Sequence, residues 1–385
     1  MKRCGRGSSI ALAAFLGVLV GAALVWALVR GGPAPVIAPR GAPATSLPAG
    51  DARPAGDARD AVSAASQDAI TAAVEKVGPA VVNISVLFQP SRQDLIARAF
   101  GIPMEPFPPA GQGSGVIIDG KNGYVITNAH VVKGAQRVMV TMANGKRLEA
   151  RVVGIDPLTE VAVVKVPGDG YTQAALGSAQ NLPIGSWVIA IGNPFGFENS
   201  VTVGVLSAKG RQIGAPGGAS LQDLLQTDAS INPGNSGGAL VDLNGNLIGM
   251  PTAVIPYAQG IGFAVSIDVA KQVADKLIKT GKMPWIGMQH TTLPAEEAKR
   301  LRLPTGPGTT VVGVIPNGPA AKAGLEPGDL ITRLGDRPIK SDRDLTQAIR
   351  ALDAGDRAEV TLTRDSRQMT ISVTLGAVPA NPGGR

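Results

Sequence analysis

The segment SINPGNSGGAL, residues 230–240, places one serine in a run of glycine and asparagine between two apolar stretches. This composition predicts a sharp turn between strands, with Ser236 on the turn. A nucleophilic serine needs such a rigid turn, and it needs backbone N–H groups aimed at the oxyanion of acyl transfer. Gly234 and Ser236 are the natural donors, because glycine lets the backbone take the required shape. Taken alone, the segment also fits a plain glycine-rich hairpin.

A second signal lies in GYVITNAHVV, residues 123–132, where His130 is expected at the end of a strand. A lone histidine in such a place is usually structural. Here an acid and then a serine follow it, in the His–acid–Ser order of chymotrypsin-type catalytic triads. His290, in WIGMQHTT, has no such companions and is expected to be a surface or groove residue.

The acid has two candidates in DPLTEVAVVKV, residues 156–166. Asp156 belongs to an Asp-Pro turn, and Glu160 stands at the mouth of an apolar strand. A buried carboxylate is costly without a partner. In an extended chain these two residues would lie about 13 Å apart, so one histidine cannot meet both. A His–Ser dyad without either acid is the third possibility.

The rest of residues 66–282 alternates short apolar runs with turns, which indicates a barrel or sandwich. Ser66 is expected to cap a first helix, and IDVAKQVADKLIKTG is expected to form a helix closing this domain. Residues 90–110 are a longer loop that contains Phe100 and Phe107. Residues 283–378 form a second unit of strands with helices near 319–324 and 344–352.

Residues 9–29 are an uncharged run of 21, preceded by Lys2, Arg3 and Arg6. Such a helix spans about 30 Å, the thickness of the hydrocarbon core of a bilayer. Residues 1–30 are therefore expected to be a cytoplasmic tip and a transmembrane helix, with the remainder of the chain outside. A cleaved signal peptide is the alternative, although its apolar region is usually about 7–15 residues. Residues 31–65 are predicted to be a linker rich in Pro, Ala and Gly, and 379–385 a disordered tail.

Composition excludes several classes of function. The net charge is +7, but residues 66–282 carry sixteen basic against fifteen acidic residues and 283–378 carry twelve against eleven. The two expected domains are thus nearly neutral, which argues against a nucleic-acid surface. Cys4 is the only cysteine, so the exported part has no disulfide. No metal-ligand spacing and no phosphate-binding glycine motif occurs, and neither a metal nor a cofactor is expected.

The motifs TNAHVV, LTEVAVVKV, AIGNPFGF, TDASINPGNSGGAL and GIGFAV, in this order, resemble the HtrA/Deg family of chymotrypsin-fold serine proteases. WIGM and VIPNGPAAKAGLEPGDLITRLGDRPI are similar to the PDZ domains of that family. The resemblance covers residues 66–378. It implies a mostly β fold: a chymotrypsin-like double β-barrel at 66–282, followed by an α+β PDZ domain at 283–378. With an N-terminal transmembrane helix the layout is similar to the DegS type, and a tethered DegQ-like relative is the alternative.

The resemblance also implies roles for individual residues. His130 matches the general base, Ser236 the nucleophile, and Gly234 with Ser236 the oxyanion hole. Glu160 stands where the family has an aspartate, which favours it over Asp156 as the partner of His130. On the triad template, Glu160→Gln is expected to lower turnover about 10⁴-fold.

Two recognition sites follow in the same way. The primary specificity pocket is expected to be lined by Ile231, Ile261 and Phe263, whose apolar character favours small aliphatic residues. The loop Trp285, Ile286, Gly287 and Met288 is expected to bind the C-terminal carboxylate of a peptide, which adds alongside as a strand.

The expected function is a serine endopeptidase of the bacterial inner membrane, facing the periplasm and gated by its PDZ domain. Its substrates would be misfolded or regulatory proteins, in protein quality control under stress. The resemblance implies a homotrimer, to which the loop at 90–110 could contribute. The alternative from another class is a pseudoprotease that acts as a peptide-binding or chaperone module. A purely structural PDZ adaptor would leave the spacing of His130 and Ser236 unexplained.

Overall fold

The computed structural model describes residues 56–88, 110–194, 196, 199–214, 220–232, 234–254 and 260–379. The expected membrane helix at 9–29, the linker up to residue 55, the phenylalanines of the 90–110 loop and the tail after residue 379 lie outside this part. Within the described ranges, no helix is both long and apolar enough to cross a membrane.

The first helix begins earlier than the sequence predicts. Helix α2 runs over Gly56–Val77 and is followed by the 3₁₀ turn η1, Gly78–Ala80. Ser66 is therefore not its N-cap, and residues 56–65 are helical rather than part of an extended linker. The reason is local propensity. The stretch before Ser66 is rich in alanine, which has the highest helix propensity, so the helix that continues over the apolar face also includes this stretch. Ala73 and Val77 of that face are buried in a hydrophobic core that they share with residues of both barrels.

Six strands then close a barrel in the order β1-β2-β3-β6-β5-β4. Alternate residues point inward, so Val82, Ile84 and Val86 of β1 lie in its core. The short helix α4 follows β3. The bounds are β1 Val81–Phe88, β2 Ala110–Asp119, β3 Tyr124–Thr127, α4 Ala129–Val132, β4 Ala135–Thr141, β5 Arg147–Asp156 and β6 Val161–Lys165.

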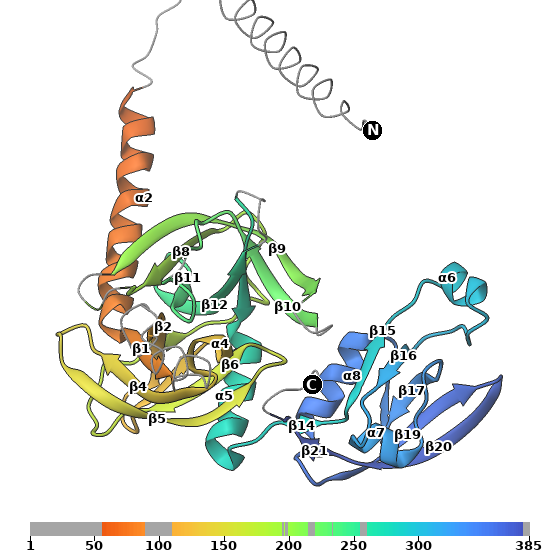
Figure 1. Cartoon of the computed structure of the whole chain (residues 1–385). Helices are drawn as coiled ribbons and strands as arrows, with labels where there is room; N and C mark the ends of the chain where they lie inside the picture. Colours follow the sequence, from red (N-terminus) through yellow and green to blue (C-terminus); the bar gives the residue numbers. More distant parts are fainter. Residues whose placement is uncertain are drawn as a thin grey trace, which may run out of the picture. The chain divides into compact units, whose positions relative to one another are not determined.

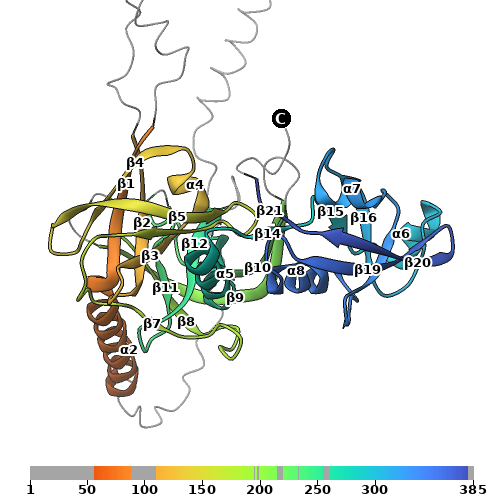
Figure 2. The ribbon, with the colours of Figure 1, turned by 90° about the horizontal axis from the view of Figure 1, so that it is seen from below.

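The next strands form a sheet in the order β11-β8-β9-β10-β13-β12-β7, and an additional pairing of β11 with β12 closes six of them into a second barrel. Helix α5 follows and lies against β5 and β6 of the first barrel and β12 and β13 of the second, as Figures 1 and 2 show. The bounds are β7 Ala175–Leu176, β8 Trp187–Gly192, β9 Ser200–Gly214, β10 Ser220–Thr227, β11 Ala239–Val241, β12 Asn246–Val254, β13 Gly262–Ser266 and α5 Ile267–Thr280.

The C-terminal domain has a sheet in the order β15-β16-β17-β19-β20, with β18 paired to β17 and a separate β14–β21 pair. Its own core includes Leu345, Val360 and Val373. The bounds are β14 Pro284–Trp285, β15 Met288–Thr291, α6 Ala295–Arg300, β16 Thr309–Val314, α7 Pro319–Ala323, β17 Leu330–Leu334, β18 Arg337–Pro338, α8 Asp342–Ala351, β19 Arg357–Arg364, β20 Arg367–Thr374 and β21 Gly376–Ala377. The expected double barrel followed by an α+β domain is confirmed.

Candidate active site

His130 lies in helix α4, directly after β3, and not at the end of a strand as the sequence suggested. The side chains of Val131 and Val132 are buried in the first barrel, which fixes this single turn of helix. The His130 side chain is itself about half exposed. The strand ends at Thr127 because the following residues turn to bury the two valines, and the turn directs the imidazole outward.

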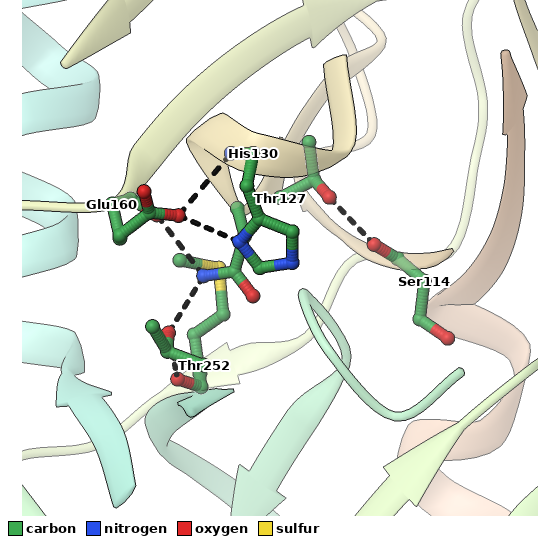
Figure 3. Close-up of polar contacts among 7 residues, drawn as sticks. Ser114, Thr127, His130, Glu160 and Thr252 are labelled. Carbon is green, nitrogen blue, oxygen red and sulfur yellow. Dashed lines mark hydrogen bonds and ion pairs between the residues drawn. The ribbon is translucent and has the colours of Figure 1, made fainter. Parts of the chain in front are cut away.

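Glu160 lies in the turn between β5 and β6, and its carboxylate faces His130 (Figure 3). Its Oε2 accepts a hydrogen bond from His130 Nδ1 at 2.7 Å and a longer one from the His130 backbone N–H at 3.2 Å. The backbone of Glu160 is left-handed, with φ at 59°. Its carbonyl accepts from Ala129 N at 3.1 Å and from Asn128 Nδ2 at 3.0 Å, and these bonds hold the strained residue in place.

Asp156 is the last residue of β5 and is buried. Its carboxylate accepts from Leu158 N at 3.2 Å and from Thr159 Oγ1 at 2.7 Å. Burial raises the pKa of this carboxyl, and the bond from Thr159 offsets only part of that rise. Residues 157–160 form a turn, so the expectation of an extended chain between Asp156 and Glu160 was wrong. The Asp-Pro pair starts the turn, and the Asp156 side chain closes it.

Ser236 is half-buried in the turn that connects β10 to β11. Its carbonyl accepts from Ser114 N at 2.9 Å, and the next N–H, of Gly237, donates to Pro251 O at 2.9 Å. A Cβ on Gly237 would lie 2.3 Å from the Ser114 carbonyl oxygen, so the close approach of the two barrels here requires glycine. The N–H groups of Gly234 and Ser236 make no hydrogen bond within the described part of the chain.

His130 and Ser236 are not joined by a hydrogen bond among the described residues. Because Nδ1 is occupied by Glu160, Nε2 is the ring nitrogen left for the serine. Bonds of this kind are often long without substrate and shorten in the reacting complex. The two halves of the site thus come from different barrels, with His130 and Glu160 on the first and Ser236 on the second.

Three polar residues of the site escaped the sequence reasoning: Ser114, Asn128 and Thr252. Asn128 is buried and donates to Glu160 O and, at 2.6 Å, to Thr252 Oγ1, while Thr252 donates to Met250 O (Figure 3). This series of hydrogen bonds connects the turn that contains Glu160 to β12 of the second barrel. The available signal was a polar residue inside an otherwise buried apolar segment, which is expensive unless hydrogen bonds compensate its burial. The amide nitrogen of Asn128 is bonded in this way, whereas its buried Oδ1 has no partner among the described residues.

The structure does not bring the three residues predicted for the specificity pocket together. Ile231 is buried, and a Cβ on Gly262 would lie 2.6 Å from its Cγ1, so these two residues are in contact. Phe263 and Ile261 instead pack with the cluster beside α5, apart from the cluster of Ile231. Neighbouring residues of a strand point to opposite faces, so Phe263 faces away when Gly262 faces Ile231. Of the residues predicted for the pocket, Ile261 and Phe263 thus pack apart from Ile231, and Gly262 is the residue of this segment that contacts it.

The predicted peptide-binding loop connects β14 to β15. Trp285 pairs with Gly376, Ile286 is buried, Gly287 has φ at 79°, and Met288 begins β15. The Ile286 carbonyl accepts from Ala320 N at 2.8 Å and the Gly287 carbonyl from Ile315 N at 2.9 Å. Both carbonyls are thereby held by the domain, while the N–H groups of Ile286 and Gly287 have no acceptor among the described residues.

Strand β15 pairs with β16 on one side, and no described strand pairs with its other edge. His290 of β15 is half-buried, 3.4 Å from Thr309 Oγ1, and burial lowers its pKa. It therefore lies in the C-terminal domain, remote in sequence and role from the His130–Glu160 pair.

Comparison with known proteins agrees with this geometry. Residues 113–250 match the trypsin-like peptidase domain and residues 284–375 match the PDZ domain. The chain is 41% identical over 337 residues to the serine protease named HhoB from Synechocystis sp., covering 82% of this chain and 80% of that protein. It is 38% identical over 344 residues to a DegP-like periplasmic serine endoprotease of Ectopseudomonas mendocina, covering 82% and 72%.

Solved structures agree. The HtrA-type protease AlgW with a tripeptide has a TM-score of 0.65 at 34% identity, covering 82% of this chain and 99% of that one. The same protease with a decapeptide has a TM-score of 0.63, with 80% and 98% or more covered.

The chain belongs to the HtrA family of serine proteases. It is a serine endopeptidase with one PDZ domain, and the pseudoprotease alternative finds no support among these relatives.

Proposed function

We propose that His130, Glu160 and Ser236 are the catalytic triad of this HtrA endopeptidase. Ser236 Oγ attacks the carbonyl carbon of the scissile peptide bond and its proton passes to His130 Nε2. Glu160 keeps the proton on Nδ1 and stabilises the imidazolium. The oxyanion is bound by the N–H groups of Gly234 and Ser236. His130 then protonates the leaving amine, and water hydrolyses the acyl-enzyme by the same steps.

The observation that carries this assignment is the 2.7 Å contact between His130 Nδ1 and Glu160 Oε2, made by a glutamate in a strained left-handed conformation. A strained non-glycine residue persists only where its surroundings hold it, and such residues cluster at active sites. The turn of Ser236 supplies the second half, because the N–H groups of Gly234 and Ser236 have no acceptor among the described residues and the neighbouring peptide groups are held by hydrogen bonds.

The test is cleavage of unfolded casein by the parent and by Ser236→Ala. The variant should lose turnover on the order of a million-fold, as triad serines do. A fluorophosphonate probe should label the parent and not the variant. Residual cleavage at the parental rate, or labelling of Ser236→Ala, would refute the assignment.

We further propose that the loop Trp285–Met288 binds the free C-terminus of a peptide, which adds to the unpaired edge of β15. The first turn of helix α8 lies at the end of β15, since Asp342 N donates at 2.7 Å to Oγ1 of Thr292, the residue after that strand. The same helix contacts the protease domain: Arg343 Nε lies 2.6 Å from Asp223 Oδ1, and Lys276 Nζ donates to the Arg350 carbonyl at 2.9 Å.

A peptide between β15 and α8 would therefore act on contacts that reach the protease domain, which supports gating by the PDZ domain. Peptides with a free hydrophobic C-terminus should bind and change the rate of casein cleavage. Amidation of that terminus should abolish both the binding and the change in rate. If the amidated peptide binds and changes the rate as the free peptide does, the loop does not bind the carboxylate.

The setting of the enzyme is proposed from the sequence and the relatives. The apolar run at 9–29 supports a single-pass anchor in the bacterial inner membrane, and the DegP-like relatives are named periplasmic. We propose periplasmic protease and PDZ domains, assembly as a homotrimer, and misfolded or regulatory proteins as substrates. Full-length protein should stay in the membrane pellet after alkaline carbonate extraction. A soluble mature form that begins after residue 30 would show a signal peptide instead.

A further inference from the structure

Ser114 is a fully buried serine of strand β2, in the first barrel. Each of its polar groups is bonded. Its N–H donates to the Ser236 carbonyl at 2.9 Å, and its own carbonyl accepts from Thr127 Oγ1 at 2.7 Å (Figure 3). Its hydroxyl donates to the Gly234 carbonyl at 2.5 Å and accepts from Asn193 N at 2.7 Å.

These bonds fix the peptide groups on both sides of the proposed oxyanion donor. A peptide group is planar, so a bond to its carbonyl and a bond from its N–H together fix its orientation. The group from Gly234 to Asn235 bonds to Ser114 Oγ on one side and, through Asn235 N, to Asn232 O at 3.0 Å on the other. The group from Ser236 to Gly237 is held in the same way, by Ser114 N and Pro251 O.

Between these two fixed groups lies the peptide group of Asn235 and Ser236. Its carbonyl accepts from Gly238 N at 2.9 Å, and its N–H, on Ser236, has no acceptor in the part of the chain that the structure describes. Rotation of this N–H away from the oxyanion would require breaking the bonds of its neighbours. Ser114 thus supplies, from the other barrel, two of the bonds that keep the donor in position.

The hydroxyl of Ser114 also reaches a third segment. Asn193 N donates to it, and the Asn193 side chain accepts from Gly196 N at 2.6 Å, so the loop after β8 is joined to the same point. That loop packs directly on the turn, because a Cβ on Gly234 would lie 2.3 Å from Pro194 Cβ. One hydroxyl therefore links β2, the loop after β8 and the turn of Ser236.

We propose that the Ser114 hydroxyl is a positioning group for the oxyanion hole: by bonding Gly234 O and Asn193 N it fixes the turn that holds the Ser236 N–H donor where the tetrahedral intermediate forms. The inference rests on the proposed triad. It places no group of Ser114 in contact with substrate, so its loss acts on the transition state through the turn. Donors fixed before the reaction stabilise developing charge without a reorganisation cost.

The test compares Ser114→Ala with Ser178→Ala in the full-length enzyme. The Ser178 hydroxyl likewise donates to one oxygen, Asp268 Oδ1 at 2.9 Å, and accepts from one backbone N–H, of Gln180 at 3.2 Å, but it lies outside the site. Steady-state cleavage of a peptide substrate gives kcat and KM. Inhibition by a peptide boronic acid, which bonds to Ser236 and mimics the tetrahedral intermediate, reports the oxyanion hole separately.

Ser114→Ala should lower kcat about 10- to 100-fold, less than the roughly 10²- to 10³-fold loss of a donor itself. KM should stay within about twofold, and boronate affinity should fall by about the same factor as kcat. Ser178→Ala should leave all three near the parent. Equal losses in both variants, or parental kcat and boronate affinity in Ser114→Ala, would overturn the proposal.

If Ser114→Ala does not fold, Ser114→Cys takes its place, because a thiol fills the site but is only a weak donor. The same losses are then expected, and parental kcat in Ser114→Cys would overturn the proposal. Ser236→Ala separates the two levels of inference. If Ser236→Ala is inactive and Ser114→Ala is fully active, only the positioning role of Ser114 is refuted. If Ser236→Ala is active, the proposed triad is refuted.

Discussion

Replacement of Glu160 by glutamine removes one negative charge and leaves a side chain of the same length. In the parent a single oxygen, Oε2, accepts from both His130 Nδ1 and the His130 backbone N–H. The backbone N–H can only donate, so it favours the amide oxygen of glutamine at that position. The amide NH₂ would then point the other way, and the proton would remain on Nδ1.

The expected loss is therefore electrostatic and not tautomeric. A unit charge pair about 4 Å apart interacts by about 4 kcal/mol near a protein surface, or about 10³-fold in rate. His130 is half exposed, so solvent reduces this value. Glu160→Gln should lower kcat about 10²- to 10³-fold, less than the 10⁴-fold expected from the triad template alone, in which the wrong tautomer is held.

The assay is kcat on a peptide substrate for Glu160→Gln, Glu160→Asp and Asp156→Asn. Glu160→Asp should stay within about a hundred-fold of the parent, since aspartate tolerates the left-handed backbone although it is one methylene shorter. Asp156→Asn should keep its activity. A fully active Glu160→Gln with an inactive Asp156→Asn would refute the choice of acid. If all three keep parental kcat, the site acts as a dyad. A loss near 10⁴-fold for Glu160→Gln would refute the argument from the backbone N–H.

Two further predictions concern Asp156 and Ile231. Because burial raises the pKa of Asp156 above its ordinary 3.8, the folded state keeps this proton to higher pH than the unfolded chain. As pH rises above about 4, the free energy of unfolding of the parent should fall relative to that of Asp156→Asn, until the pH passes the raised pKa of Asp156. Urea unfolding of both proteins from pH 4 to 8 measures this difference. A difference that does not change with pH would contradict the prediction. Ile231→Ala should shift the ratio of kcat/KM towards substrates with larger residues before the cleaved bond, and an unchanged ratio would exclude Ile231 from the pocket.

The strands of both barrels could be predicted because alternation and glycine-rich turns are local signals. VAVVKV forms β6 at Val161–Lys165, and the segment after Gly78-Pro79 forms β1 at Val81–Phe88. The start of α2 and the helical position of His130 could not be predicted in this way. For α2 the sequence analysis gave the pattern of the linker more weight than the helix propensity of the alanine-rich stretch before Ser66. For His130 the burial of Val131 and Val132 in the first barrel, which depends on distant residues, determines the helical turn.

The pocket shows a second kind of limit. Ile261, Gly262 and Phe263 are consecutive, and which of them faces Ile231 depends on the register between β10 and β13. A shift of one residue exchanges the two faces of a strand. The apolar character of the segment predicts a strand, but only the pairing of Gln226 with Phe263 determines that Gly262 contacts Ile231.

The choice between the two acids rests in the end on a different argument from the one that the sequence offered. Extended geometry separated Asp156 from Glu160, yet the chain between them is a turn. Asp156 is excluded as the partner of His130 because its carboxylate already accepts hydrogen bonds from Leu158 N and Thr159 Oγ1 within that turn. Those bonds set the geometry in which Glu160 takes its left-handed conformation and reaches His130. The first acid is thus structural, and its position in the turn directs the second acid to the histidine.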